Sequence, residues 1–599
     1  MASMDLDSFM AAAAEHFEAV QPFVPMYIHL ILSALFPIYA GAHASLSRPS
    51  SAAKPEKKSK RKVGLDDEDD DEDTVQKMEG LSPKDAILFP ITAGLVLAGL
   101  YFLIKRYGAD LINLVMGWYF AFVGVYSVAR LVNDAATVAI GFVFPTYFAH
   151  RGILYHVDGE ERAAKPQGQN ASTSASLRSP VPLLPAFSKS FYDGVWAVRA
   201  TVKRRYSFRA FVHGFVDLKA KVTIINFLSA AIGLASILYA NLVAKPWYLT
   251  NLQGFAVCYS AMQFLSPTTF GTGSLILSGL FFYDIWAVFF TPLMVTVAKN
   301  LDQPIKLVFP RPHEAPTAPG QAPPPRSYSM LGLGDIVLPG IMIGLALRFD
   351  LYMFYLKKQK VARSGCNGPK KAASMEKAPF VPATGFWGDR FWTLFLRSDL
   401  VPDTLKTSFP KTYFWSSVVG YTIGMLTTLG VMSVFQHAQP ALLYLVPGVL
   451  LSLWGTALVR GEVKQLWEFT EALNAEQIEE SDNKKGSKTA ENEDKKSDDR
   501  TFWQKLKDEL FGAGEEKPKE DERTDPDAGA DGKSAARKST GPDDGVLFAF
   551  VLSRYDPSKA SASDKLAREP EVNTQASAPT AQSQTSSESD LEIVCRNEA

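Results

Sequence analysis

Two apolar stretches decide the fold of this chain, Leu275-Ile-Leu-Ser-Gly-Leu-Phe-Phe-Tyr-Asp-Ile-Trp-Ala-Val-Phe-Phe290 and Met330-Leu-Gly-Leu-Gly-Asp-Ile-Val-Leu-Pro-Gly340. Each has the composition of a membrane span, and each contains one aspartate, Asp284 or Asp335. A charged side chain at the centre of a bilayer costs about 2.5–3.5 kcal/mol on insertion scales, so such residues usually pair, line water or do chemistry. Two of them on consecutive spans indicate one shared site.

Seven further apolar runs are long enough to cross a bilayer, which takes about 20 predominantly apolar residues. The nine expected spans cover residues 22–44, 86–104, 111–129, 222–243, 247–266, 273–298, 330–348, 413–435 and 440–459. A shorter apolar run at 135–150 contains Pro145, and we expect it at the membrane interface. The pattern predicts an all-α polytopic membrane protein with nine transmembrane helices.

Basic residues indicate how these spans are oriented. Clusters of Lys and Arg follow span one, precede span four and follow span seven, and cytosolic loops carry such an excess. These three loops share one side if there are nine spans and the N-terminus lies outside the cytosol. An acidic leader in residues 1–21 also favours that orientation, whereas Lys105 and Arg106 after span two are contrary evidence. We therefore expect a cytosolic C-terminal tail.

The polar segments have the composition of disordered chains. Hydrophobic residues make up 47% of the 599 residues and charged residues 21%, but the two classes are segregated along the chain. From about residue 460 onward the sequence is mainly Lys, Glu, Asp, Ser and Ala, which is typical of disorder. Residues 502–511, with apolar side chains at helical spacing, and the apolar run 546–552 are exceptions. The formal net charge of −1 says nothing about partners, because the charged residues are segregated from the apolar runs. We expect no nucleic-acid partner.

Two carboxyl groups that share one site do not both ionise cheaply, so they hold one proton between them. The ionised oxygen can take a proton from water while the protonated partner polarises a carbonyl, as in aspartic proteases. The sequence has no Gly-x-Ser-x-Gly motif, no histidine cluster and no ligand-like cysteine spacing, so we expect no metal and no cofactor. This chemistry favours a protease. A proton-coupled transporter or channel, and a non-proteolytic factor in membrane-protein turnover, are the alternatives.

The depths of the two aspartates agree only if the sixth span is interrupted. Asp335 lies about five residues, roughly 8 Å, inside span seven, whereas Asp284 lies about 14 residues, roughly 21 Å, from the same side of an unbroken span six. A proline removes a helical hydrogen bond and commonly ends or kinks a helix. We therefore predict a break near Thr291-Pro292, with residues 293–299 near the interface.

Three short motifs occur in order on the expected spans: Tyr283-Asp284, Gly332-Leu333-Gly334-Asp335 and Pro440-Ala441-Leu442. Together they resemble the signature of the presenilin-like intramembrane aspartyl proteases. The flanking stretches 294–299, 304–310 and 437–447 are similar to the signal peptide peptidase family within that group. The resemblance covers residues 22–460.

The resemblance implies roles for these motifs. Asp284 and Asp335 would be the catalytic dyad of an aspartic endopeptidase, and Pro440-Ala441-Leu442 would lie beside it and help to bind the substrate. Without the resemblance, Pro440 would mark no more than the start of a helix. The remaining active-site motif residues would be Tyr283, Gly332, Leu333 and Gly334.

The resemblance also implies a cellular setting. The family has a presenilin-like fold of nine spans in the endoplasmic reticulum membrane, with a lumenal N-terminus and a cytosolic C-terminus. Its substrates are transmembrane segments of type II orientation, including signal peptide remnants, and these contain residues that destabilise a helix. The implied partners are such substrates, the lipid bilayer, membrane-protein degradation machinery and a second copy of the chain.

The chain divides along these lines into seven segments. These are a lumenal segment (1–21), spans one to three with a charged cytosolic loop at 45–85 (22–129), an interfacial segment and cytosolic loop (130–221), spans four to seven (222–350), a cytosolic insertion (351–412), spans eight and nine (413–460) and a disordered cytosolic tail (461–599). The insertion, the loop between spans three and four, and the tail depart from the family pattern.

Overall fold

The computed structural model describes residues 21–53, 78–167, 176–182, 188–212, 216–301, 303–311, 328–361, 375–397, 400–402, 404–406, 408–435, 439–471 and 548–554. Several expected features lie outside these residues. They are the leader 1–20, the charged run 54–73, most of the proline-rich connector 310–326 and the amphipathic run 502–511.

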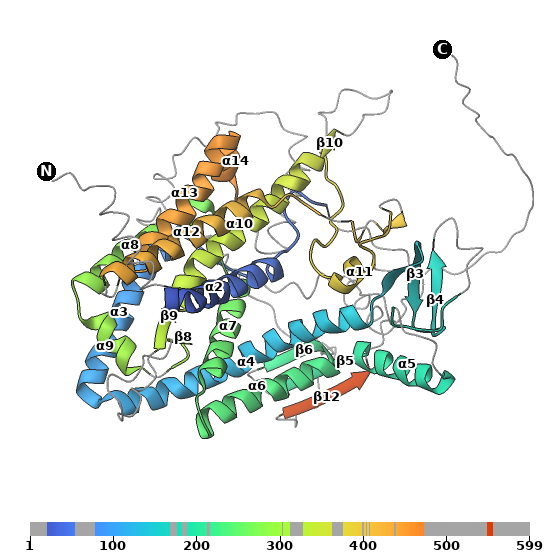
Figure 1. Ribbon diagram of the computed structural model, residues 1–599, viewed down its shortest axis with the longest axis horizontal. Coiled ribbons are helices and arrows are strands. Elements are labelled where there is room, and N and C mark those ends of the chain that lie inside the picture. The colour runs from blue at the N-terminus through green and yellow to red at the C-terminus, as the bar shows by residue number, and fades with distance from the viewer. Residues whose placement is uncertain are drawn as a thin grey trace, which may run out of the picture.

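Long helices occupy all nine positions where the sequence predicts a span (Figure 1). They are α2 (Val24–Ala44), α3 (Pro83–Tyr107), α4 (Ala109–Val143), α6 (Ile224–Leu242), α7 (Trp247–Phe264), α8 (Phe270–Phe289), α10 (Gly334–Lys358), α12 (Thr412–Phe435) and α13 (Leu442–Arg460). Among the described residues, eight helices are long and apolar enough to cross a membrane. The ninth, α7, has 18 residues and carries Asn251, Gln253 and Gln263. A count of nine spans therefore stays a prediction.

Shorter elements connect and flank these helices. The helices are η1 (Gln21–Phe23), α5 (Lys189–Lys203), α9 (Leu293–Asn300), α11 (Trp387–Trp392) and α14 (Val463–Glu468). The strands are β1 (Glu79–Leu81), β2 (Tyr147–His150), β3 (Ile153–Asp158), β4 (Ala163–Gln167), β5 (Arg205–Val212), β6 (Val216–Thr223), β7 (Leu265–Pro267), β8 (Lys306–Pro310), β9 (Tyr328–Gly332), β10 (Lys360–Val361), β11 (Met375–Glu376) and β12 (Phe548–Arg554). The fold is mostly helical, as the sequence predicts, and the strands lie between or beyond the long helices.

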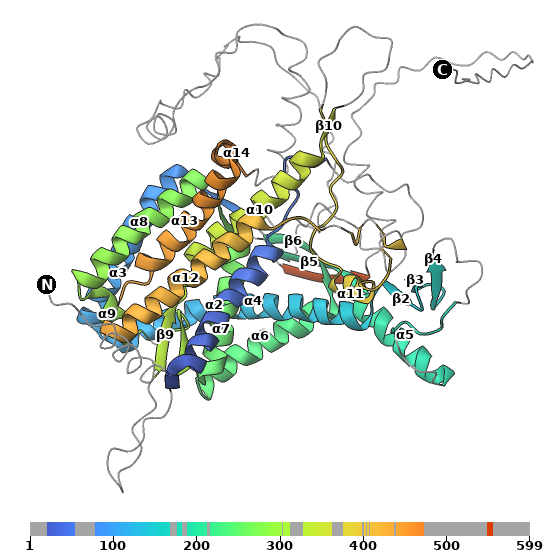
Figure 2. The same cartoon turned by 45° about the horizontal axis from the view of Figure 1, so that its top comes forward.

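Helix α10 lies at the centre of the helical core. In its most apolar window, 83% of the residues are buried, compared with 6% in α3. It packs against α2, α7, α8, α12 and α13. Figure 2 shows α8, α13, α12 and α10 running alongside one another, while α4 and α6 form a second layer that α7 joins to the core. The helix that carries Asp335 is therefore held on several sides.

The predicted break in the sixth span is confirmed. Helix α8 ends at Phe289, and the short helix α9 begins at Leu293, directly after Pro292. The Thr291 hydroxyl donates to the Ala287 carbonyl across 2.7 Å, which occupies an acceptor left free at the helix end. The expected single span 273–298 is therefore wrong in its extent, because Pro292 has no N–H with which to continue the helix.

The seventh span begins later than expected. Residues 328–332 form β9, which pairs antiparallel with β8, and α10 starts only at Gly334. Helix α10 then continues to Lys358, ten residues beyond the expected end at 348. The helix therefore passes the expected boundary at 350 between the spans and the insertion, and the position of that boundary stays a prediction. Asp335 is the second residue of α10 rather than the fifth or sixth of a span.

The third span is longer than expected. Helix α4 continues without interruption through the boundary at 129 and ends at Val143, so residues 135–143 extend this helix. The polar residues Asn133 and Asp134 interrupt the apolar sequence, so the sequence does not indicate that the helix continues past them. Asp134 accepts a hydrogen bond from the Tyr259 hydroxyl of α7 across 2.6 Å, which gives its carboxyl group a partner within the α4–α7 contact.

Three segments expected as loops or disordered tail contain regular structure. Strands β2, β3 and β4 form one antiparallel sheet between spans three and four. Strands β5 and β6 form a hairpin to which β12, from the expected tail, adds a third antiparallel strand. Residues 461–471 pack on the helical core through Leu466 and Phe469, both buried. The expectation of a disordered tail is therefore wrong for residues 461–471 and 548–554.

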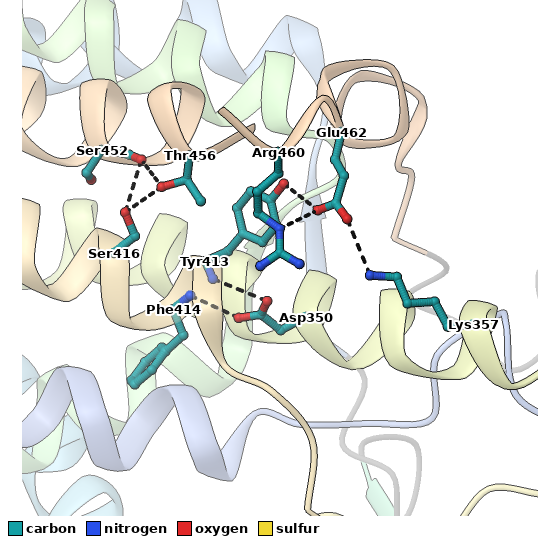
Figure 3. Close-up of polar contacts among 9 residues, drawn as sticks. All are labelled: Asp350, Lys357, Tyr413, Phe414, Ser416, Ser452, Thr456, Arg460 and Glu462. Atoms are coloured by element: carbon teal, nitrogen blue, oxygen red, sulfur yellow. Dashed lines mark hydrogen bonds and ion pairs between the residues drawn. The ribbon is translucent and has the colours of Figure 1, made fainter. Parts of the chain in front are cut away.

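Polar contacts join α10, α12 and α13 at one end of the core (Figure 3). Asp350 of α10 accepts hydrogen bonds from the N–H groups of Tyr413 and Phe414, across 3.2 and 3.0 Å. Those groups belong to the first turn of α12, where a helix has no internal acceptors. Asp350 thus caps a neighbouring helix.

Candidate active site

Asp284 and Asp335 lie where the end of one helix meets the start of another. Asp284 is five residues before the end of α8, and Asp335 is in the first turn of α10. The side chain of Asp284 is buried, and that of Asp335 is half-buried. The two carboxyl groups are close enough for an electrostatic interaction between them. The structure therefore brings together the two aspartates that the sequence singles out.

The Pro440-Ala441-Leu442 motif is at the same place. Pro440 and Leu442 are buried, and Ala441 is the N-cap of α13. The main-chain N–H of Leu442 donates to Oδ2 of Asp284 across 3.1 Å. Through this bond, the start of α13 holds the carboxyl group on α8.

Both carboxyl groups lie at helix N-termini, which carry a partial positive charge from the helix dipole. Asp335 occupies the first turn of its own helix, α10, and Asp284 accepts its hydrogen bond from the first residue of α13. A carboxylate near a helix N-terminus is stabilised by about 0.3–1 kcal/mol. This arrangement helps the pair to hold negative charge in an apolar environment.

The hairpin of β8 and β9 leads directly into the site. It pairs Lys306 with Gly332, and the N–H of Leu333 donates to the Ile305 carbonyl across 3.1 Å. Asn251 of α7 fixes the hairpin from the side, because its amide accepts from the Val308 N–H at 2.7 Å and donates to the Val308 carbonyl at 2.9 Å. The backbone before Asp335 is therefore extended and anchored.

The two glycines of the Gly332-Leu333-Gly334 motif have different surroundings. A Cβ added at Gly332 would lie 3.2 Å from Oδ2 of Asp335, which is tighter than nine in ten real Cβ contacts. A Cβ at Gly334 would meet only Leu338, at 4.0 Å. Leu333 is buried against Gly254 of α7. Gly332 thus makes room for the Asp335 carboxyl group, whereas Gly334 does not.

Tyr283 is half-buried beside Asp284. Its ring is 6.5 Å from that of Trp286, and it faces Gly94 of α3, where an added Cβ would lie 3.4 Å from the ring. The ring therefore fills the space between α8 and α3 next to the buried carboxyl group.

Sequence reasoning missed two residues of this region. Asn251 could have been found from the sequence, because it is a polar side chain within an expected span, and such side chains usually have a partner. Tyr421 of α12 is fully buried, and its hydroxyl donates to the main-chain carbonyl of Asp335 across 3.3 Å. No local pattern marks Tyr421, because only packing brings it to α10.

The chemistry of the site rests on carboxyl groups. Within the stretches that the structure describes, no three His, Cys, Asp or Glu side chains are placed to hold a metal ion. The groups gathered here are two carboxyls and a main-chain N–H, together with the tyrosine hydroxyl that bonds Asp335. Such a set can move protons and donate hydrogen bonds.

Comparison with known proteins identifies the family. The family model described as signal peptide peptidase matches residues 72–472. Signal peptide peptidase of Mus musculus is 28% identical to the chain over 478 residues, covering 78% of this chain and 91% of the mouse protein. The Homo sapiens protein of the same name is 26% identical over 467 residues, covering 78% of this chain and 88% of the human one. Intramembrane protease 2 of Caenorhabditis elegans is 36% identical over 243 residues, covering 41% of this chain and 42% of the nematode protein.

The matched region makes up more than half of the chain and contains Asp284, Asp335 and Leu442. It also contains seven of the eight helices that are long and apolar enough to span a membrane, all except α2. The chain is therefore a multi-pass membrane protein, and it belongs to the signal peptide peptidase family of intramembrane proteases.

Proposed function

We propose that this protein is an aspartic endopeptidase that hydrolyses peptide bonds within transmembrane segments, with Asp284 and Asp335 as its catalytic dyad. The observation that carries the proposal is that the two carboxyl groups, on α8 and α10, lie within electrostatic range of each other, with that of Asp284 bonded to the N-terminus of α13. Membership of an intramembrane protease family supports it.

In the proposed reaction the two carboxyl groups share one proton. The ionised group takes a proton from a water molecule, whose oxygen attacks the carbonyl carbon of the scissile bond. The protonated group polarises the carbonyl oxygen and gives up its proton to it. The tetrahedral intermediate then collapses as the C–N bond breaks: the leaving nitrogen takes a proton from the protonated carboxyl group, and one hydroxyl of the intermediate gives its proton to the other, so the dyad again holds one proton. Because Oδ2 of Asp284 accepts a hydrogen bond from the Leu442 N–H, we propose that Oδ1 is the oxygen that takes the proton from water.

The substrate in this proposal is a transmembrane helix that unwinds locally. Helical carbonyls are bonded within the helix, so the scissile bond becomes accessible only in extended backbone. Extended backbone is already present beside the dyad in β9, which ends three residues before Asp335. The position of Pro440-Ala441-Leu442 against Asp284 supports the proposal that this motif helps to bind the substrate.

The substrate class and the setting follow the relatives. Proteins named signal peptide peptidase align over most of the chain, so we propose signal peptide remnants and type II transmembrane segments as substrates. We further propose an endoplasmic reticulum membrane location, a lumenal N-terminus and a cytosolic C-terminus. Contact with membrane-protein degradation machinery and self-association are also proposed, on the resemblance alone.

One experiment tests the proposal. The purified full-length chain is incubated in nanodiscs with a labelled signal-peptide substrate, alongside Asp284→Asn and Asp335→Asn. Asp193→Asn, which changes an exposed carboxyl group on α5, is the control. We expect cleavage by the wild type and the control and none by the two dyad variants. Unchanged cleavage in either dyad variant would overturn the catalytic assignment.

The same variants separate the alternatives. A proton-coupled transporter would show a proton flux in proteoliposomes that the dyad variants lose, without any peptide product. A non-proteolytic factor would support membrane-protein turnover in cells as well with Asp335→Asn as with the wild type. Either result, together with no cleavage by the wild type, contradicts the protease.

A further inference from the structure

The insertion between α10 and α12 contains an aromatic segment, Phe386-Trp-Gly-Asp-Arg-Phe-Trp-Thr-Leu-Phe-Leu396, that the catalytic site does not use. Helix α11 lies within it and packs against α4 (Figure 1). We call the four large apolar side chains that this segment exposes the aromatic foot. They are Trp387, Phe391, Leu394 and Phe395.

Directional contacts hold this segment on the end of α4. Oδ1 of Asp389 accepts hydrogen bonds from the N–H groups of Thr146 and Tyr147, across 2.6 and 3.0 Å. The indole N–H of Trp392 donates to the Phe142 carbonyl, in the last turn of α4, across 2.8 Å. Asp389 is buried, so these contacts are shielded from water. The segment is therefore fixed in orientation relative to α4.

A close backbone contact adds to this attachment. Gly388 lies against the main chain of Gly141, and a Cβ added at Gly388 would overlap the Gly141 carbonyl group. Glycine permits such an approach because it has no side chain. The insertion and the helix end therefore behave as one surface.

The aromatic foot faces away from the protein. Phe395 is 94% exposed, Leu394 68% and Phe391 52%. Burying a large apolar side chain is worth about 1.5–3 kcal/mol, so contiguous exposure of this kind marks a contact with something apolar.

The foot continues the outer surface of α4. Val138, Phe142 and Val143 are exposed along the last turns of that helix, and the Phe142 and Phe391 rings meet edge to face at 5.6 Å. Between Asp134 and His150 the sequence has no charged side chain. The exposed apolar side chains of the last turns of α4 therefore continue onto the aromatic foot.

The length of α4 places this junction at the membrane boundary. Its 35 residues make a helix of about 52 Å at 1.5 Å per residue, longer than a hydrocarbon core of about 30 Å. Its last turns therefore pass through the interfacial layer, where Trp and other aromatic residues are enriched. Because α4 is a candidate membrane span, lipid is the occupant expected on its exposed apolar side chains.

We propose that the aromatic foot inserts into the interfacial layer of the leaflet at the C-terminal end of α4. The insertion thereby anchors the end of this long helix in the bilayer, and its partner is the lipid surface rather than a protein.

Depth-dependent fluorescence quenching tests this. A cysteine-free chain (Cys258→Ala, Cys366→Ser, Cys595→Ser) receives one cysteine, at Phe395→Cys, labelled with an environment-sensitive NBD probe. The protein is placed in phosphatidylcholine nanodiscs at one copy per disc, with and without lipid carrying a nitroxide near the headgroup. Phe122→Cys, 80% exposed in the middle of α4, is the lipid-facing control. Glu160→Cys, exposed in the β3–β4 turn, is the water-facing control.

We expect a blue-shifted emission at Phe395→Cys and quenching by the headgroup nitroxide, with deeper-placed nitroxides quenching Phe122→Cys better. Glu160→Cys should show neither effect. Leu394→Cys repeats the test if Phe395→Cys does not fold, and retained substrate cleavage reports folding. If the emission of both Phe395→Cys and Leu394→Cys resembles that of Glu160→Cys, the proposal is overturned. A blue shift that arises only with two copies per disc would assign the foot to a dimer contact, and would overturn it as well.

Discussion

The main-chain N–H of Leu442 donates a hydrogen bond to Oδ2 of Asp284 across 3.1 Å, and it links residues 158 positions apart. The N–H groups in the first turn of a helix have no partner within the helix. Asp284 therefore supplies an acceptor to α13 in addition to its proposed chemical role. Substitutions at Asp284 can separate the two roles.

Asp284→Asn and Asp284→Ala should both lose cleavage but differ in stability. The asparagine carbonyl oxygen can still accept from the Leu442 N–H, whereas alanine leaves that buried donor without a partner, which costs about 1–3 kcal/mol. We expect both to fall by at least about 10³-fold in activity. Thermal unfolding in detergent should show Asp284→Ala as the less stable variant. Equal stability would mean that the hydrogen bond contributes little.

Gly332→Ala and Gly334→Ala form a matched pair beside Asp335. The added Cβ at residue 332 would lie 3.2 Å from Oδ2 of Asp335 and would push the carboxyl group by a few tenths of an ångström, whereas at residue 334 it makes an ordinary contact. Misplacement of a reacting group by about 1 Å can cost 10²-fold. We therefore expect a clear loss of kcat for Gly332→Ala and near wild-type cleavage for Gly334→Ala, from steady-state kinetics. The reverse order would contradict the geometry.

Glu471→Ala should strongly destabilise the protein. Arg348 of α10 and Glu471 form an ion pair in which both side chains are buried, and Arg348 also donates to Ser45 and Ser266, across 2.7 and 2.5 Å. Removing one partner of a buried pair costs about 3–5 kcal/mol, because the other charge stays buried and unpaired.

The double variant Arg348→Met with Glu471→Leu is the control for that prediction. It removes both charges at once and should recover most of the lost stability, since apolar replacements of buried pairs are often neutral or stabilising. Thermal unfolding of the wild type, the single variant and the double variant in one detergent makes the comparison. A single variant as stable as the wild type would show that residue 471 is not held at Arg348.

Glu462 should make stability depend on pH in the acid range (Figure 3). Burial acts to raise the pKa of Glu462, but the Tyr413 hydroxyl, Arg460 and Lys357 outweigh it and hold this pKa below its usual value of 4.5. The unfolded chain therefore binds a proton more readily, so the contribution of Glu462 is complete above about pH 4.5 and is lost as the pH falls through the lower folded pKa.

The variant Glu462→Gln tests this directly. It should unfold at a lower temperature than the wild type at pH 7, and the difference should shrink as the pH falls below about 4.5. Glu468→Gln is the control, because Glu468 is exposed and its contact with Lys464 spans 3.8 Å. A Glu462 effect that is equal at all pH values would exclude its charge as the cause.

The sequence predicted those features that depend on neighbouring residues. Apolar runs of about 20 residues marked the positions of the long helices, because a membrane span is recognised by the composition of one continuous stretch of sequence. Pro292 marked the break after α8 for the same reason, since a missing N–H acts on its own turn. The two aspartates stood out because a carboxyl group is unusual in an apolar run.

Features that depend on distant partners were missed or misjudged. The third span was expected to end at residue 129, yet α4 continues to Val143, and Asp134 within it has a hydrogen-bond partner in Tyr259, 125 positions away. Residues 461–471 read as tail because their composition is polar, yet Arg348 offers Glu471 a buried charge to pair with. The composition of a segment does not show which distant residue will pair with its polar side chains after folding.

The sequence by itself determined that this protein has long apolar helices, a break at Pro292 and two aspartates on consecutive spans, because each of these features depends on residues that are close together in the chain. Only the tertiary structure decided what each carboxyl group contacts. Asp350 lies in the same helix as Asp335, but it caps α12, whereas Asp335 lies within electrostatic range of Asp284. The difference arises because the packing of α8, α12 and α13 around α10 sets the partner of each carboxyl group.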